Sequence, residues 1–585
     1  MACLALTVSL TDTTPSAAQS ADTGSRLDAV THAAKLDPAT PHSLGLRWHV
    51  AGDSNGNATV AVAFRRAGSE AWVETLPLLR VRPENQHPVR RRDGIVLFAG
   101  SLLELTPDTA YEIRLRLHDP DGGDREERLA ARTAAEPRLP ADLRRRHVTP
   151  FSNERKGGGK GSQADPFNGL KVAERAARPG DLFLLAPGVY RSSLKIGRSG
   201  REGRPVVYRG PDDGGAILDG DGAEVLVDAS DARHVWLRGL HLRNADTLIL
   251  ADRARHLVVQ GNRFAVTRAG YVAKGAFGGE SEGHAILDNI FESNTVWPRS
   301  KGIEHVFAVG LSGAGHVIAY NRMENLGDCV RGAWVDGGEA LMWATDIHNN
   351  DMQSCTDDGI EADHGEANVR VFRNRITNSF AAISGQPIFG GPAYIYRNAI
   401  YNTLYSPFKM HNDTSGMLLF HNSSVRSGIP FYIRTSTERV TDSMTRNNLF
   451  IGTEGPALTS TAKMRRNDFD ADGYGWVQGA FALWNGRTYN TARDAREAGA
   501  LYLRHGITAL DPFRVFDGPL ASPNPDKRHA SRVNRPLLAP KSKAVDAGVT
   551  IPGLNADFAG AAPDLGCCEL GAALPHYGPR PPFAP

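Results

Sequence analysis

The chain has 585 residues, 41% of them hydrophobic and 23% charged, which is ordinary for globular proteins and predicts two or three domains. A formal net charge of +2 disfavours nucleic acid as a partner, because a nucleic-acid-binding domain normally carries a concentrated basic face. After the first residues, no stretch approaches the ~20 apolar residues of a membrane span.

The first residues predict an export signal. Residues 2–10 form a short apolar run, and residues 16–21 offer small side chains for cleavage. We therefore expect 1–22 to be a signal segment and the protein to be secreted or periplasmic, where disulfides persist. Cys329 and Cys355 are placed so that neighbouring turns of a repeat would bring them together, and Cys567 is adjacent to Cys568. The sequence fixes no pairing among them.

Residues 23–136 predict a β-sandwich. Polar and apolar residues alternate over 44–50 and 58–64, as in half-buried strands. The segment 105–111 places Leu105, Pro107, Thr109 and Tyr111 at alternate positions. This pattern resembles the L-x-P-x-T-x-Y signature of fibronectin type III domains, in which the tyrosine forms a corner against nearby backbone. The resemblance implies a module that spaces or binds rather than catalyses.

A second unit is expected over 137–520, after a proline-containing linker at 136–140. A helix predicted over 166–178 precedes an apolar strand at 181–186. This order resembles the entry to secreted right-handed parallel β-helices, where a short helix caps the first coil. A cap is needed because an open stack of strands exposes unpaired backbone at its end. We expect another helix over 491–505, and residues 521–585 resemble the C-terminal tail of such proteins, which packs on the β-helix.

Regularly spaced asparagines mark the coils of this second unit. Asn350, Asn374, Asn398 and Asn422 are 24 residues apart, and Asn448 follows after 26. The series extends upstream, at longer intervals, to Asn262, Asn289 and Asn321. A period of this length is typical of a solenoid, whose units bury their apolar faces by stacking. Asparagine tolerates left-handed backbone and bonds to nearby amides, so we expect a hydrogen-bonded ladder.

The register of the coils predicts which side chains face solvent. Aligning Ile360, Ile383 and Phe408 on the interior turns the residues between them outward. One outward row then holds Glu361, Ser384, Lys409 and Tyr432, with Arg331 near Glu361, and a second holds Asp363, Gln386, His411 and Arg434. Neighbouring coils lie ~4.8 Å apart, so these side chains can touch, although a slip of one residue would reverse them all. Such a mixture of acids and bases favours a site over a merely solvated face.

This patch is suited to β-elimination on a uronic-acid polymer. Lys409 is the expected base, because neighbouring cations lower the pKa of a lysine, and His411 is base or acid. Arg434 or Arg331 would bind the substrate carboxylate, while Gln386, Tyr432 and Ser384 contact the sugar. Glu361, Asp363 and Asp358 are candidate ligands for Ca²⁺, which would neutralise the same carboxylate.

A family resemblance supports this interpretation. Asp358-Gly359-Ile360-Glu361 resembles the acidic, calcium-binding strand of β-helix alginate and chondroitin lyases, which pair it with a lysine base and an arginine. Here Asp363 replaces their second glutamate, and Lys409 lies two coils away. The resemblance implies a monomeric polysaccharide lyase acting on an acidic polysaccharide. The expected fold is all-β, a right-handed parallel β-helix after a fibronectin type III-like β-sandwich.

Other functions fit the same residues. A glycoside hydrolase would use two carboxyl groups from Asp357, Asp358, Glu361 and Asp363, with Lys409 and His411 binding the substrate. A C5-epimerase would use nearly the residues of a lyase. A noncatalytic, polysaccharide-binding or adhesive β-helix would carry stacked aromatic side chains along its groove, where the predicted patch has only Tyr432.

Overall fold

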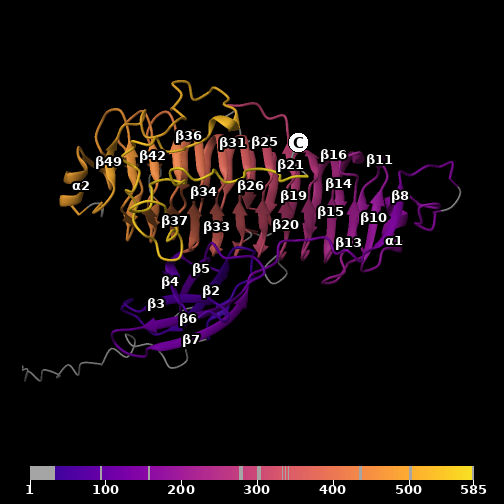
Figure 1. The fold of residues 1–585 in the computed structure, drawn as a ribbon, viewed down its shortest axis with the longest axis horizontal. Helices are drawn as coiled ribbons and strands as arrows, with labels where there is room; N and C mark the ends of the chain where they lie inside the picture. Colours follow the sequence, from indigo (N-terminus) through magenta and orange to yellow (C-terminus); the bar gives the residue numbers. More distant parts are fainter. Residues whose placement is uncertain are drawn as a thin grey trace, which may run out of the picture.

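An antiparallel β unit leads into a long parallel β-solenoid in the computed structural model (Figure 1). The structure describes residues 33–91, 95–155, 158–275, 281–298, 305–332, 334–335, 338–339, 341–433, 438–499 and 503–582. The expected signal segment 1–22 and Arg434 lie outside these residues.

The N-terminal unit is a seven-stranded antiparallel sheet, with the strand order β1-β2-β5-β4-β3-β6-β7 among the described residues. Alternate residues of these strands, such as Trp48 on β2 and Ile113 on β6, bury the core of the unit. The Thr106 N–H donates to the Tyr111 hydroxyl at 3.0 Å, which confirms the predicted contact of this tyrosine with nearby backbone. The strands are β1 (Lys35–Leu36), β2 (Leu44–Ala51), β3 (Thr59–Arg66), β4 (Val73–Val81), β5 (Ile95–Leu102), β6 (Ala110–His118) and β7 (Arg125–Arg132).

One parallel sheet of the solenoid has fourteen described strands, one from almost every coil. These are β8 (Arg144–Thr149), β9 (Phe167–Asn168), β10 (Asp181–Leu185), β13 (Val206–Arg209), β15 (Val235–Arg238), β17 (Val258–Gln260), β20 (Ala285–Leu287), β24 (Val317–Ala319), β30 (Asp346–His348), β33 (Val369–Phe372), β35 (Ala393–Tyr396), β37 (Met417–Phe420), β41 (Met444–Arg446) and β45 (Asp468–Phe469).

The second parallel sheet has seventeen described strands and folds over two faces. Its long strands bend where a residue such as Asn378 or Asn402 takes a positive φ, of 58° and 62° respectively. The strands are β11 (Gly188–Arg191), β12 (Leu194–Lys195), β14 (Ala216–Asp228), β16 (Leu240–Asp252), β18 (Arg263–Ala265), β19 (Ala269–Lys274), β21 (Ile290–Glu292), β22 (Phe307–Leu311), β25 (Arg322–Leu326), β26 (Asp328–Gly332), β31 (Asp351–Glu361), β34 (Arg375–Gly385), β36 (Ala399–Met410), β38 (Ser423–Val425), β42 (Leu449–Ile451), β46 (Gly473–Gly475) and β49 (Ile507–Leu510).

Short strands line the turns between the two large sheets. They are β23 (Gly313–Ala314), β27 (Trp334–Val335), β28 (Gly338–Glu339), β29 (Met342–Trp343), β32 (Gly365–Ala367), β39 (Phe431–Ile433), β40 (Arg439–Thr441), β43 (Leu458–Ser460), β44 (Lys463–Arg465), β47 (Ala482–Trp484) and β48 (Arg487–Tyr489). Two 3₁₀ turns, η1 (Pro83–Asn85) and η2 (Ser531–Val533), lie in the N-terminal unit and the tail.

Helices are short and lie at the ends of the solenoid (Figure 1). Helix α1 (Leu170–Ala176) begins after Gly169, whose φ of 90° is not helical, so it is shorter than the predicted 166–178. Helix α2 (Ala492–Glu497) starts at a capping box of Thr491 and Asp494 and is followed by Gly499 at a φ of 63°, so it too falls short of its predicted span. Neither helix, nor any other in the described part of the chain, is long and apolar enough to cross a membrane.

The predicted asparagine ladder is present. The side-chain oxygen of Asn422 accepts both the backbone N–H and the side-chain amide of Asn398, at 3.1 and 2.9 Å. The Asn398 amide also donates to the Val371 carbonyl at 2.9 Å. The same bonding connects every successive asparagine from Asn262 to Asn448 and ends on the Asp472 carboxyl. Because each asparagine side chain bonds the backbone of the preceding coil, the ladder sets the register of the stack.

The N-terminal unit covers the outer face of the fourteen-stranded sheet around β33 and β37 (Figure 1). Leu103 packs there against a column of rings in which Phe372 and Tyr396 stack at 4.8 Å. Polar contacts are buried in the same interface, among them the Ser101 N–H donating to the Tyr394 hydroxyl at 3.0 Å. This sheet is therefore not available to a long polymer.

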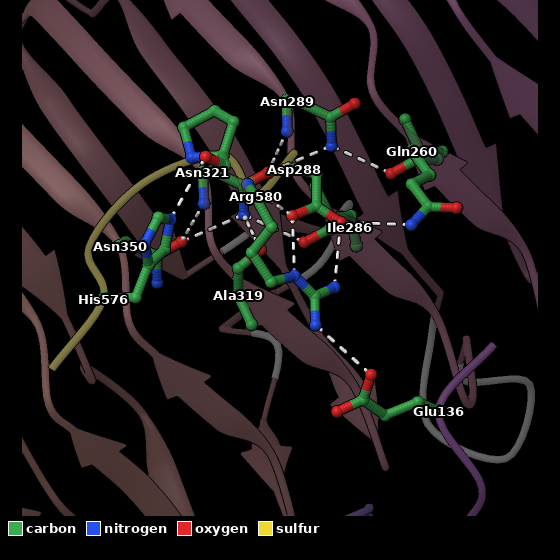
Figure 2. A network of polar contacts seen from close by, with 12 residues as sticks. Glu136, Gln260, Ile286, Asp288, Asn289, Ala319, Asn321, Asn350, His576 and Arg580 are labelled. Carbon is green, nitrogen blue, oxygen red and sulfur yellow. Dashed lines mark hydrogen bonds and ion pairs between the residues drawn. The ribbon is translucent and has the colours of Figure 1, made fainter. Parts of the chain in front are cut away.

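The C-terminal tail crosses several coils and closes back on the linker. Arg580 donates to both carboxylate oxygens of Asp288, with Nε–Oδ1 and Nη2–Oδ2 distances of 2.9 Å (Figure 2). It also reaches Glu136 at 3.2 Å, and its guanidinium lies 3.9 Å from the ring centroid of Tyr320. Further up the tail, Asn534 donates to the carbonyls of Ile376 and Ala399. The tail thereby covers the first halves of the long strands and leaves their second halves open.

The ladder gives a stability prediction. Replacing Asn398 with alanine leaves the buried backbone and side-chain amides of Asn374 without their acceptor. We expect Asn398→Ala to lower the free energy of unfolding by about 3 kcal/mol or more, since each orphaned buried polar group costs ~1–3 kcal/mol. Urea denaturation followed by circular dichroism measures this change. Asn294→Ala, at an exposed asparagine, is the control and should stay close to wild type; equal losses in both variants would contradict the role of the ladder.

Candidate active site

The candidate site lies on the open face formed by the second halves of the long strands. Glu361 pairs with Ser384 across β31 and β34, and Ser384 pairs with Lys409 across β34 and β36, which confirms the predicted register of this row. Arg331 follows Val330, the partner of Ile360, and its Nε lies 3.9 Å from Glu361 Oε2. The row continues upstream through Gly310, Val272 and Leu250. A continuous line of outward positions therefore runs along the solenoid.

A bulge in β31 shapes the acidic end of this row. The register of β31 shifts between Cys355 and Asp358, and directly beneath it a buried disulfide joins Cys355 to Cys329. The Asp358 N–H donates to Asp328 Oδ1 at 3.2 Å, so the bulge brings these two buried aspartates together. In the tail, Cys567 and Cys568 form a second disulfide. The sequence had fixed neither pairing.

Lys409 crosses a strand to reach this bulge. Its Nζ lies 2.8 Å from Asp358 Oδ2, although Asp358 is on β31 and Lys409 on β36. The strand between them presents only small side chains, Ser384 and Ala381, at the positions paired with Glu361 and Asp358. The aliphatic part of the Lys409 side chain passes over these small residues, and only 15% of the side chain is exposed.

The predicted lowering of the pKa of Lys409 is wrong. Burial alone would lower it, but the carboxyl groups of Asp358, Asp363 and Asp357 outweigh burial, and the net pKa of Lys409 is raised. The direction differs from the prediction because the groups around Lys409 are carboxyl groups, whereas the prediction placed cations there. Lys409 is thus an ammonium group at neutral pH, able to pair or donate but not to abstract a proton.

The pKa of Glu361 is raised as well, which for a carboxyl group favours the neutral form. Burial, followed by the nearby acids Asp328, Asp363 and Asp358, raises the pKa of Glu361 to about 10, with Arg331 opposing them. Burial and Asp357 likewise raise the pKa of Asp328 to about 7. Because several carboxyl groups share a space with two cations, the cluster retains protons at neutral pH. Glu361 is the member whose pKa is raised to about 10 while part of its side chain, 17%, is exposed to solvent.

The second predicted row lies in the turn after these strands. Asp363 is buried, and its Oδ1 accepts the Ser384 hydroxyl and the Gln386 N–H, both at 2.7 Å. His411 follows β36, and its Nε2 lies 2.9 Å from the Tyr405 hydroxyl. Ser384 is therefore a buried support for Asp363 rather than an open contact for substrate. Arg434, the last member of the row, falls outside the described residues.

Aromatic side chains flank the cluster, contrary to the expectation that Tyr432 stands alone. Phe380 and Tyr405 stack with ring centroids 5.1 Å apart, and Tyr405 meets Tyr432 edge-on at 5.8 Å. Each of the three is half-buried, so parts of the rings face solvent. The sequence analysis did not predict Phe380 and Tyr405, because both residues precede the row of aligned outward positions. A signal did exist, since the two lie six and seven residues after ladder asparagines Asn374 and Asn398.

Asp328 is a further residue of the site that the sequence did not predict. It lies seven residues after Asn321, and Asp357 lies seven residues after Asn350. Counting from the ladder would have placed Asp328 beside Asp357 on the preceding coil.

The predicted Ca²⁺ ligands do not surround a common point. Asp358 is paired with Lys409, and Asp363 accepts two donors of the chain, whereas Ca²⁺ takes six to eight oxygen ligands. Among the described residues, no group of three or more histidine, cysteine, aspartate or glutamate side chains is arranged to hold a metal ion. The residues do not fit Ca²⁺ in this arrangement, and calcium dependence stays a prediction.

Comparisons with known proteins give similar folds only. No protein-family model and no curated protein matches the sequence. Among solved structures, the pectate lyase Pel9A aligns with a TM-score of 0.38 and 14% identity, over 73% of this chain and 97% of that chain. An exopolygalacturonase from Yersinia enterocolitica aligns with a TM-score of 0.31 and 11% identity, over 75% of this chain and 95% of that chain. A rhamnogalacturonan lyase aligns with a TM-score of 0.33 and 15% identity, over 52% of this chain and 82% of that chain. At these scores no residue role is transferred.

The raised pKa of Asp328 predicts a pH-dependent stability. The folded state holds this proton up to a pKa of about 7, whereas the unfolded chain releases it near 4, so the contribution to stability is present below pH 4 and lost as the pH rises to 7. We expect Asp328→Asn to reduce the fall in unfolding free energy between pH 4 and 7 by up to a few kcal/mol, since one pKa unit corresponds to ~1.4 kcal/mol. Urea titrations at several pH values measure it. Asp246→Asn, at an exposed aspartate, should reproduce the wild-type slope, and an unchanged slope in Asp328→Asn would refute the assignment.

Proposed function

We propose that this protein cleaves glycosidic bonds of a polysaccharide lying along the outward row, by acid–base catalysis on its carboxyl cluster. The observation that carries the proposal is Glu361, a carboxyl group on the outward row that has a pKa raised to about 10 and is partly exposed to solvent. A general acid that is still protonated at neutral pH is what departure of a sugar oxygen requires.

Hydrolysis assigns two roles to β31. Glu361 donates its proton to the glycosidic oxygen as the bond to the anomeric carbon breaks. A water molecule adds to that carbon and gives its proton to the carboxylate of Asp357. Burial raises the pKa of Asp357, which suits a base, while Lys409, Arg331 and His305 oppose this rise. Transfer of this proton back to Glu361 through solvent restores the enzyme.

Lys409 and the aromatic side chains support this chemistry. By pairing with Asp358, Lys409 places a positive charge inside the cluster, and this charge opposes the rise in the pKa of Asp358 that burial causes. Tyr405 and Tyr432 offer ring surface on which a sugar can lie, beside the His411 that bonds to Tyr405. Aromatic rings combined with acids favour an enzyme over an adhesive β-helix, whose groove would need the rings alone.

β-Elimination is the second candidate, and one observation favours it. The Tyr405 hydroxyl and His411 Nε2 form a hydrogen-bonded pair at 2.9 Å beside the groove, a pair that can remove one proton and supply another. Lys409 would then neutralise a substrate carboxylate rather than act as the base. A C5-epimerase would use the same pair.

We infer that the N-terminal unit is fibronectin type III-like, in support of this role. Its strand order and the Tyr111–Thr106 contact are those expected of such a domain. It acts as a brace, because it packs on the sheet opposite the groove. The Cys329–Cys355 disulfide beneath the site suits work outside the cytoplasm.

A substrate panel tests the reaction. The protein is incubated with neutral and uronic-acid polysaccharides, with and without chelator, while new reducing ends and absorbance from a C4=C5 double bond are followed. Hydrolysis predicts reducing ends without absorbance and no loss of activity with chelator. Absorbance would instead establish β-elimination, and loss with chelator would restore the Ca²⁺ assignment. No product from any polymer would refute an enzymatic role.

Removal of the acid tests its assignment. Glu361→Gln keeps the shape of the side chain but supplies no acidic proton, so kcat should fall about 10²–10⁴-fold, the usual contribution of general acid catalysis, with little change in KM. Glu202→Gln, at an exposed turn, is the matched control. The assignment fails if Glu361→Gln keeps more than a tenth of wild-type kcat while thermal unfolding shows both variants folded.

A further inference from the structure

A second pocket opens on the same outward row, upstream of the carboxyl cluster. It has a volume of about 380 Å³ and is bounded by strands β14, β16, β19, β22 and β26. Its apolar wall includes Leu250 and Val272, the row positions that continue the line of Glu361 and Arg331. Arg331 belongs to both sites, since it lines the pocket and contacts Glu361. The pocket and the cluster therefore form one groove.

An aromatic ring forms part of the pocket surface. Phe307 lies across Gly310, where a Cβ atom would come within 2.9 Å of the ring, so a larger residue at 310 would displace it. The Arg331 guanidinium lies 5.1 Å from the ring centroid. The phenyl group thus contacts Gly310 and Arg331, and it adds a half-buried aromatic surface to the pocket lining.

The charge of this pocket is opposite to that of the cluster. Arg268, Lys274, Arg331 and His305 line it, against the single acid Glu224. Arg331 is already engaged by Asp328 and Glu361. For Arg268 and Lys274, the described part of the chain provides no carboxylate partner within salt-bridge distance, and Arg268 is exposed. Two cations are therefore available to a ligand at the edge of an apolar pocket.

We propose that this pocket is a subsite for an anionic sugar, bearing a carboxylate or a sulfate, of the polysaccharide whose bond is broken at Glu361. The inference rests on the proposed function and adds the class of substrate. From Val272 to Glu361 the row advances by three strands, or ~14 Å, so the charged sugar lies a few residues along the polymer from the scissile bond.

The charges of the two sites explain why the anionic sugar binds at a distance from the bond broken at Glu361. At the cleavage centre the cations Arg331 and Lys409 are already paired with acids of the cluster, so they offer no free charge to an anionic sugar. Arg268 and Lys274 attract the same charge where no acid of the cluster opposes it. A polymer that carries charge at intervals would then be held in one position along the groove, and a neutral polymer would not.

Binding is measured apart from cleavage, so that the two proposals fail separately. Glu361→Gln protein is run by affinity electrophoresis in gels containing polygalacturonate, carboxyl-reduced polygalacturonate or dextran sulfate. Arg268→Gln and Lys274→Gln are added singly and together, with Arg201→Gln and Lys35→Gln as controls at exposed cations away from the pocket.

Support requires retardation by one of the anionic polymers, weak retardation by the neutral one, and a dissociation constant raised about three- to tenfold by each pocket substitution, as expected for exposed charge pairs. The effect should shrink at 0.5 M salt through ~3–5 Å screening. Retardation by polygalacturonate alone identifies a carboxylate, and by dextran sulfate alone a sulfate. Equal losses in the control variants, or equal binding of the neutral polymer, would overturn the subsite, whatever the result of the cleavage assay.

Discussion

Stacking of identical amides holds this molecule in register. Each ladder asparagine presents its oxygen to one neighbour and its amide to another, inside a core where an unpaired polar group is costly. A coil cannot slip by one residue without breaking these bonds, and such a slip would exchange the inner and outer faces. The identity of the outward row, and hence the place of every candidate residue, depends on this bonding.

The charges of neighbouring groups then distinguish positions of the outward row that have the same backbone geometry. Along one row, the same outward geometry carries Val272, Arg331, Glu361 and Lys409. These residues differ in burial and in their charged neighbours. Burial and the acids around the bulge in β31 raise the pKa of Glu361, and acids of the same cluster raise the pKa of Lys409. One lysine that reaches across a strand offsets part of a cluster that would otherwise resist folding at neutral pH. The chemistry of the site is therefore a property of the group rather than of any member.

The sequence predicted the fold better than the site. The 24-residue period predicted the ladder, and the alignment of the apolar residues Ile360, Ile383 and Phe408 predicted the pairing of Glu361, Ser384 and Lys409. Neither pattern revealed the bulge between Cys355 and Asp358, where the register changes by one. Partners such as Asp358 for Lys409, or Tyr405 for His411, lie off the repeating row, and the sign of the Lys409 pKa shift depended on them. The clamp of Arg580 on Asp288 and Glu136 joins segments too distant in sequence for any local pattern to reveal.

That clamp has a consequence for the length of the groove. A solenoid grows or shrinks by duplication and loss of coils, and the ladder alone would tolerate either, since one asparagine step is like another. The tail is fixed on coils far apart. Asn534 binds Ala399, and Arg580 binds Asp288 (Figure 2). A coil gained or lost between these two anchors would change their separation, and the tail could no longer bind both. The position of the tail therefore depends on the number of coils between its two anchors, and so does the length of the outward row that it leaves open.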